Sequence, residues 1–192
     1  MADDDRLRAD RLREAELLVR AGHGEARAAG ALVDRQGPRL MAFALRMTGG
    51  DRALSEDIVQ ESFLRLWRKA GDWDVDGPAQ LSTWLGRVAA NLAVDARRRA
   101  ARQAPLDAAG DVADAAPSAL AGLIGAERRT ALDAALARLP ERQRQAVVLR
   151  HVEGYSNPDI AAMLGCGVEA VESLTARGKR RLAELLGDTG DV

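Results

Sequence analysis

The chain has 192 residues, a formal net charge of −1 and one cysteine, and it is rich in Ala, Leu and Arg but poor in aromatic residues. This composition favours helices over sheets, and the near-neutral charge argues against tight independent binding to nucleic acid. The single cysteine excludes an internal disulfide and a multi-cysteine metal site, so we expect an all-α protein of one or two domains, without a cofactor, in a reducing compartment.

The N-terminal part is predicted as a series of helices. The first residues, MADDDRLRAD, are acidic and lack an apolar core, so we expect no signal peptide. No apolar run is long enough to span a membrane, which predicts a cytoplasmic protein without membrane insertion. Helices are expected at residues 6–19, 25–36, 39–48, about 55–70 and roughly 79–99, separated by Gly22-His23-Gly24, Gly37-Pro38, Gly49-Gly50-Asp51 and a polar loop at 71–77.

The helix expected at 55–70 has two distinct faces. Its core stripe contains Ile58, Val59, Phe63 and Leu66. The opposite side carries Asp57, Gln60, Glu61, Leu64 and Arg68. Carboxylates beside an exposed leucine suit a basic and apolar partner surface, whereas the alternative is an ordinary solvated face.

The helix expected at 79–99 combines a core stripe with a basic face. Leu81, Trp84, Leu85, Val88 and Leu92 form the stripe. Arg87, Asn91, Val94 and Arg98 recur on another face, with Thr83 near the start and Arg97-Arg98-Arg99 at the end. Arginine and asparagine suit phosphate and base-edge contacts. Arginines in a last turn also stabilise the helix dipole, which explains the cluster but not Arg87 and Asn91.

Trp73 lies in the polar loop before that helix. It could stack on an unpaired base or simply cover the edge of the domain. The composition then changes at residues 100–117, AARQAPLDAAGDVADAAP, where large apolar groups are almost absent. This segment is predicted to be a flexible acidic linker because it cannot bury enough surface to offset its ordering entropy. Helical pattern resumes near residue 119 and continues to residue 138.

The run from Leu139 to Leu186 predicts three helices with a tight turn before the last. Gly154 is expected to close the first helix, Ser156 or Asn157 to cap the second, and Leu164-Gly165-Cys166-Gly167 to form the turn. This pattern is typical of a helix-turn-helix that enters a DNA major groove. In the last helix, Val168, Val171, Leu174, Leu182 and Leu185 are predicted to face the core, and Glu169, Ser173, Arg177 and Arg180 to face outward.

Together these motifs resemble the extracytoplasmic-function class of bacterial sigma factors, the smallest promoter-specificity subunits of RNA polymerase. The run SEDIVQESFLRLW (55–67) is similar to region 2.2 of that family. Residues 83–95, followed by basic residues, are similar to regions 2.3 and 2.4, and residues 139–186 to region 4. The resemblance covers most of residues 25–186.

The resemblance implies a domain layout and a set of partners. The layout is a helical extension at 1–24, a region-2-like domain at 25–100, a linker at 101–118 and a region-4-like helix-turn-helix domain at 119–187. The partners are core RNA polymerase through its β′ clamp and β subunit, promoter DNA and an anti-sigma factor. The implied protein initiates transcription, often in a stress response, and is not an enzyme.

The resemblance also assigns residues to these partners. Asp57, Gln60, Glu61 and Leu64 would contact the β′ clamp. The melted −10 element would meet Trp73, Ser82, Thr83, Trp84, Arg87, Asn91, Arg97, Arg98 and Arg99, and the −35 element would meet Asn157, Glu169, Ser173, Arg177, Lys179 and Arg180. The alternative is a stand-alone dimeric helix-turn-helix regulator, which would need a symmetric dimer and tight specific binding without polymerase.

Overall fold

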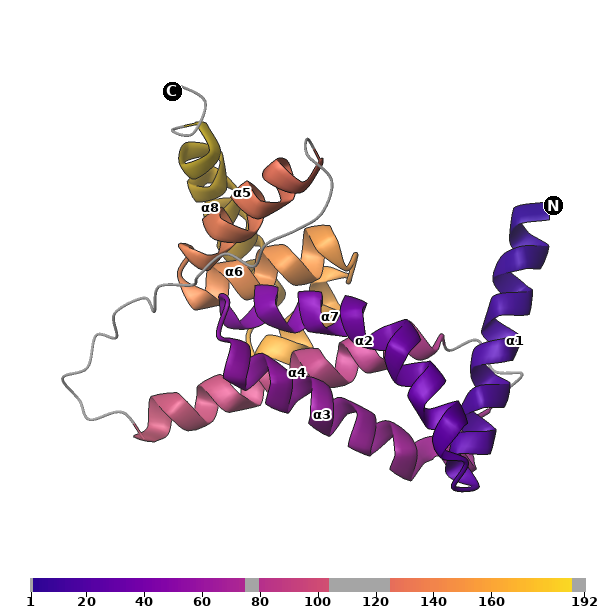
Figure 1. Cartoon of the computed structure of the whole chain (residues 1–192). Coiled ribbons are helices and arrows are strands. Elements are labelled where there is room, and N and C mark those ends of the chain that lie inside the picture. Colours follow the sequence, from indigo (N-terminus) through magenta and orange to yellow (C-terminus); the bar gives the residue numbers. More distant parts are fainter. Residues whose placement is uncertain (1, 75–79, 104–124, 188–192) are drawn as a thin grey trace. The chain divides into compact units, whose positions relative to one another are not determined.

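The computed structural model describes residues 2–74, 80–103 and 125–187, and every regular element in these ranges is helical (Figure 1). The all-α prediction is therefore confirmed for this part of the chain. None of the described helices is long and apolar enough to cross a membrane. In chain order the elements are α1 (Ala2–Gly22), α2 (Ala26–Thr48), α3 (Arg52–Lys69), η1 (Ala70–Asp72), α4 (Leu81–Gln103), α5 (Gly125–Ala137), α6 (Glu141–Val147), η2 (Val148–Val152), α7 (Asn157–Leu164) and α8 (Val168–Gly187).

The helices form two compact units. Unit 1 comprises Met1–Ala44 and Glu56–Leu92, and unit 2 comprises Leu45–Ser55 and Ala93–Val192. Unit 2 therefore contains the turn between α2 and α3 and the second half of α4 as well as the C-terminal helices. The domain boundaries expected at residues 24, 100 and 118 remain predictions.

The predicted linker is only partly visible. Helix α4 continues to Gln103, so the first residues of the expected linker are helical. The remainder, 104–118, lies outside the described residues, as do the expected restart of helix near residue 119 and part of the polar loop, 75–79.

Helix α2 corrects one expectation, because the two helices expected at 25–36 and 39–48 are a single helix that contains Pro38. The proline lacks one backbone hydrogen bond but is itself exposed. Buried residues recur every three or four positions on both sides of it, so one face packs along the whole helix. These residues are Ala28, Leu32, Gln36, Leu40, Phe43, Ala44 and Met47.

Unit 1 is held together by an apolar core between neighbouring helices. Its fully buried side chains include Leu18, Leu32, Leu66 and Leu85. The end of α1 lies so close to η1 that a Cβ on Gly22 would be 2.8 Å from the Cβ of Ala70. A polar contact also joins α1 to α2, where Glu14 accepts hydrogen bonds of 2.7 Å from Arg35 and Gln36.

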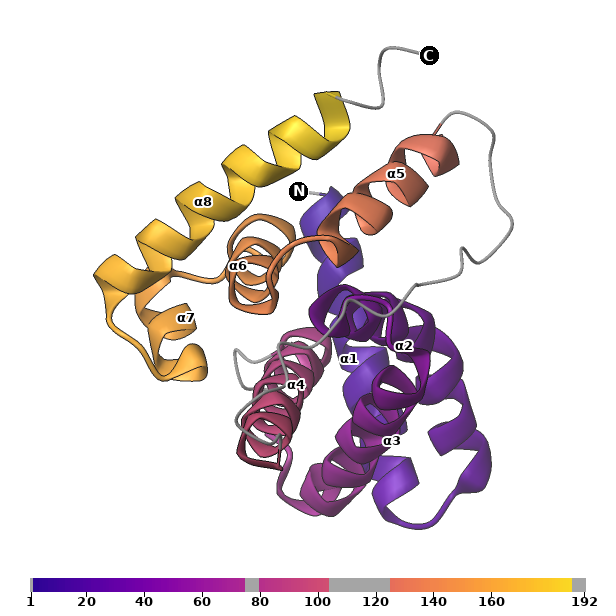
Figure 2. The same ribbon diagram turned by 90° about the vertical axis from the view of Figure 1, so that its left-hand side faces the viewer.

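Unit 2 contains the predicted helix-turn-helix, formed by α7 and α8 after α6 and η2 (Figure 2). Gly154, at φ 75°, follows η2, and Gly165, at φ 60°, ends α7; both adopt the left-handed conformation that glycine tolerates. Ser156 is the cap of α7, since its side chain accepts a hydrogen bond of 3.3 Å from the amide of Asp159. Asn157, the other capping candidate, is the first helical residue.

Helix α8 packs tightly on α6. Val171, Leu182 and Leu185 are buried as predicted, but Val168 is 41% exposed, so its assignment to the core is wrong. Gly178 was not singled out by the sequence analysis. A Cβ on it would be 2.6 Å from Val147 Cγ2 and 3.2 Å from the carbonyl oxygen of Gln143, so the two helices approach closely only because residue 178 is glycine.

Candidate nucleic-acid interface

The outward face of α3 carries the residues predicted to bind polymerase. Asp57 and Gln60 are exposed, and Leu64 between them and the end of the helix is 42% exposed. Glu61 is half-buried and accepts a hydrogen bond of 2.9 Å from Arg65, which lowers the pKa of its carboxyl. Asp57 makes no ion pair with any described residue, so it carries the uncompensated negative charge of this face.

The other side of α3 anchors this face. Ile58, Phe63 and Leu66 are buried, and the Phe63 ring stacks on Trp67 with centroids 5.8 Å apart. Ser62 is also buried, and its hydroxyl donates a hydrogen bond of 2.6 Å to the Ile58 carbonyl. The buried side of α3 therefore holds the helix in the core, while its polar side remains accessible.

Two tryptophans predicted to meet the −10 element lie together. The ring of Trp73 packs edge-on against that of Trp84, with centroids 6.1 Å apart and planes at 86°. Both are half-buried, so Trp73 covers the domain edge and still presents part of its surface. Ser82 and Thr83, in the first turn of α4, are half-buried and exposed respectively.

The basic face of α4 is partly as predicted. Arg87, Asn91, Arg98 and Arg99 are exposed, but Val94 is only 3% exposed and belongs to the core, which corrects its assignment to this face. The last arginines contact their own helix: Arg99 donates to the carbonyl of Asp95 at 3.4 Å, and Arg98 lies 3.8 Å from the Asp95 carboxylate.

The outward face of α8 is polar and exposed. Arg177 donates a hydrogen bond of 3.0 Å to the hydroxyl of Ser173, so these two side chains are held together. Asn157, at the start of α7, is half-buried and donates to Glu172 on α8 at 3.4 Å. The other residues predicted for the −35 element, which are Glu169, Lys179 and Arg180, are all exposed.

A histidine in η2, His151, has a lowered pKa. Partial burial lowers the pKa of His151, and the nearby positive charges of Lys179 and Arg150 lower it further. The sequence analysis gave this residue no role. Because its pKa is lowered, the neutral form of His151 is favoured beside Lys179 and Arg150.

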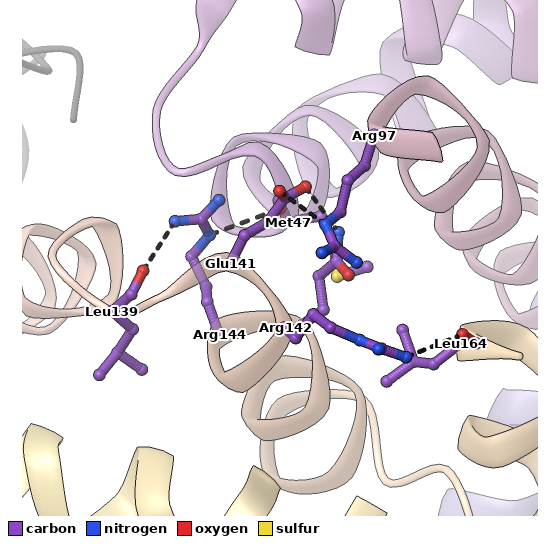
Figure 3. A network of polar contacts seen from close by, with 8 residues as sticks. Met47, Arg97, Leu139, Glu141, Arg142, Arg144 and Leu164 are labelled. Atoms are coloured by element: carbon purple, nitrogen blue, oxygen red, sulfur yellow. Dashed lines mark hydrogen bonds and ion pairs between the residues drawn. The ribbon is translucent and has the colours of Figure 1, made fainter. Parts of the chain in front are cut away.

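A polar network in unit 2 was missed by the sequence analysis (Figure 3). At its centre, Arg144 is only 6% exposed and donates to the carbonyl oxygen of Leu139 at 3.2 Å. Beside it, Glu141 pairs with Arg97 at 2.9 Å. Helical spacing was the available signal, because Arg144 precedes the buried Val147 and Val148 by three and four residues and so lies on their side of the helix.

Comparisons with known proteins match both halves of the chain. The family described as Sigma-70 region 2 matches residues 32–103, and Sigma-70, region 4 matches residues 129–182. The ECF RNA polymerase sigma factor SigM of Mycobacterium tuberculosis is 37% identical over 176 residues, which cover 91% of this chain and 85% of SigM. RNA polymerase sigma factor CnrH of Cupriavidus metallidurans is 33% identical over 179 residues, covering 88% and 92% respectively.

Solved structures show the same relationship. The sigma factor RpoE from Bartonella quintana, in complex with the anti-sigma factor NepR, matches 83% of this chain and 96% of its own length, with a TM-score of 0.57 and 26% identity. CnrH in complex with the cytosolic domain of CnrY matches 92% and 98%, with a TM-score of 0.52 and 29% identity. With relatives matched over nearly their whole length and both sigma regions present in order, the chain belongs to the extracytoplasmic-function family of RNA polymerase sigma factors, which are DNA-binding transcription initiation factors.

Proposed function

We propose that this sigma factor presents three separate faces, α3 to core polymerase, the start and outer side of α4 to the −10 element, and α8 to the −35 element. The observation that carries the proposal is that α3, α4 and α8 each have a buried apolar side and an opposite side with exposed polar residues. The chain has no catalytic role in this scheme, because polymerase performs the synthesis.

The face of α3 suits a partner that is both basic and apolar. Asp57 supplies charge, Gln60 supplies hydrogen bonds, and Leu64 supplies apolar area at its centre. Buried apolar anchors surrounded by polar groups are typical of specific interfaces. The coiled coil of the β′ clamp is the proposed partner of these residues and of Glu61.

The pair of tryptophans suits capture of an unpaired base. The exposed part of Trp73 offers an aromatic surface, and its packing on Trp84 fixes the orientation of the ring. Stacking on an aromatic side chain contributes about 1–3 kcal/mol per base. Ser82 and Thr83 are proposed to contact the captured nucleotide. The polar face of α4, with Arg87, Asn91, Arg97, Arg98 and Arg99, is proposed to contact the backbone of the melted strand.

Helix α8 is proposed to read duplex DNA. Ser173 and Arg177 act as one preorganised group, and Arg180 and Lys179 reach neighbouring phosphates. Glu169 opposes phosphate but can accept a hydrogen bond from a cytosine amino group. With this mixed charge, α8 alone binds DNA weakly. Polymerase supplies the remaining affinity, because polymerase and promoter DNA bind the same chain and each favours the binding of the other.

Regulation by an anti-sigma factor is part of the proposal. The related RpoE is seen in complex with the anti-sigma factor NepR. We infer a comparable partner that covers the polymerase and DNA faces of this chain until a signal releases it. The stand-alone dimeric regulator receives no support from these relatives.

The test is promoter-specific transcription by core polymerase with and without the chain. We expect specific transcripts and a DNA shift only when both are present. Asp57→Lys should reduce polymerase binding, whereas Asp34→Lys, an equal charge change at an exposed position of α2, should leave it unchanged. Tight, specific promoter binding by the free chain would instead support the stand-alone regulator.

A further inference from the structure

The most unusual group in unit 2 is the buried guanidinium of Arg144. Its Nη1 donates to the carbonyl oxygens of Leu139 at 3.2 Å and Ala137 at 3.4 Å, and its Nε donates to that of Met47 at 3.5 Å (Figure 3). No described carboxylate lies within 4.0 Å of it, and burial lowers its pKa. Burial of a cation away from any carboxylate costs free energy, which the three carbonyl acceptors offset only in part.

The turn after α2 is shaped to receive this guanidinium. Gly49 has φ 77°, and a Cβ there would be 2.6 Å from both Cζ and Nη1 of Arg144. Only glycine permits this close approach. Arg144 therefore joins α6 to a segment almost one hundred positions earlier in the sequence.

Ion pairs surround this contact. Arg46 on α2 pairs with Asp133 on α5 at 2.8 Å, and Arg97 on α4 pairs with Glu141 on α6 at 2.9 Å. The guanidinium of Arg98 lies where a side chain on Gly165 would be. All these residues belong to unit 2. Asp133, Glu141 and Arg144 thus hold the end of α2 and the basic part of α4, and we call these three residues the latch.

We propose that the latch is autoinhibitory, because it occupies arginines of α4 that the −10 strand requires. This inference rests on the proposed function. The Nε of Arg97 donates to the Glu141 carboxylate, so that carboxylate takes the place of a DNA phosphate. The Arg98 guanidinium lies against the turn at Gly165 in the same arrangement, although its side chain stays 49% exposed. The −10 strand therefore binds the open chain more tightly than the latched one, and it shifts the population toward the open state.

The expected effect of cutting the latch is modest but measurable. Each ion pair is partly exposed, with side-chain exposures of 33% and 39% for Arg97 and Glu141, so solvent screens it. Such a pair changes an opening equilibrium by up to about fivefold. Removing both pairs in Asp133→Asn with Glu141→Gln should raise the affinity of the free chain for a −10 single strand by up to about twentyfivefold.

The test uses the full chain in a Cys166→Ser background, with nitroxide labels on Ala53→Cys and Ala134→Cys, which are exposed positions of unit 2. Pulsed electron resonance should give one narrow label-to-label distance, which broadens when the latch pairs are removed or when a −10 oligonucleotide is added. The control is Asp34→Asn with Glu184→Gln, an equal charge change at exposed positions outside the latch. It corrects for the general electrostatic gain in DNA affinity.

The outcomes are distinct. A broader distance together with an affinity gain beyond that of the control supports the inference. An unchanged distance in the latch variant overturns the latch, and a broader distance without extra affinity overturns its competition with DNA. Failure of the unmodified chain to give promoter-specific transcripts with polymerase would refute the proposed function instead, whatever the label distances are.

Discussion

The close packing of α8 on α6 predicts that Gly178→Ala destabilises the helix-turn-helix, although alanine is ordinarily the better helix former. Gly178 is buried in the middle of α8. The added methyl group would lie 2.6 Å from Val147 Cγ2 and 3.2 Å from the Gln143 carbonyl oxygen. The substitution therefore has two opposing effects on stability: alanine has the higher helix propensity, but its Cβ overlaps with α6.

The magnitude follows from these two opposing effects. Replacing glycine by alanine within a helix stabilises it by about 1 kcal/mol. Carbon atoms prefer separations of about 3.5–4.0 Å, so the methyl group would force the helices apart, and overpacking of this kind costs about 1–3 kcal/mol. Because the Gln143 contact is to the backbone, a new Val147 rotamer cannot relieve the whole strain. We expect a net destabilisation of up to about 2 kcal/mol.

The assay is hydrogen exchange resolved by element, with thermal unfolding as a second measurement. Amides of α6 and α8 should exchange faster in Gly178→Ala. The matched control is Gly30→Ala in α2, where nothing lies within 4 Å of the new Cβ and a stabilisation of about 1 kcal/mol is expected. If α8 exchanged more slowly in Gly178→Ala than in the unmodified chain, the inferred close approach would be wrong.

Three further predictions concern single side chains. Ser156→Ala should lower the unfolding free energy by about 1 kcal/mol in urea titrations, because it removes the cap of α7. Charge reversal at Asp57 should weaken polymerase binding more than reversal at Glu61, whose charge Arg65 already compensates; fluorescence-based binding assays would measure both. Because the pKa of His151 is lowered in the folded chain, the unfolded chain binds a proton at this residue more readily. The unfolding free energy should therefore fall as the pH drops below about 6.5, and it should fall less in His151→Gln. Urea midpoints across that range test the sign.

The sequence predicted best those features that depend on neighbouring residues. The helix-turn-helix was confirmed because Gly154, Ser156 and Gly165 each act within one turn of the chain. The helix break predicted at Pro38 was wrong for the same reason. Proline acts locally, but the buried apolar stripe that runs along the whole of α2 outweighs its effect. A helical wheel gives the direction of a side chain but not what covers it. For this reason Val168 was wrongly predicted to be buried and Val94 to be exposed.

The same distinction between local and long-range features applies to the candidate site. The outward residues of α3 and α8 could be predicted, because exposure requires only that nothing packs on them. Arg144 could not be assigned a role, because its partners include a carbonyl at residue 47, and no short-range pattern joins residues so far apart. Its helical spacing indicated burial, but only the three-dimensional structure supplies the oxygen atoms that make burial of a guanidinium tolerable.

Internal pairing of arginines also predicts that the proposed DNA-binding faces bind DNA only weakly in the free chain. When Arg97 exchanges Glu141 for a phosphate, the freed carboxylate attracts cations, which offsets part of the cation release from the DNA. A contact from an arginine that is not paired with a carboxylate releases about 0.7 cations on a single strand. The salt dependence of −10 binding should therefore be shallower for the unmodified chain than for Glu141→Gln, by up to about 0.7 in the slope of log affinity against log salt concentration. Equal slopes in the two proteins, measured by fluorescence anisotropy, would mean that Arg97 does not exchange one anion for the other.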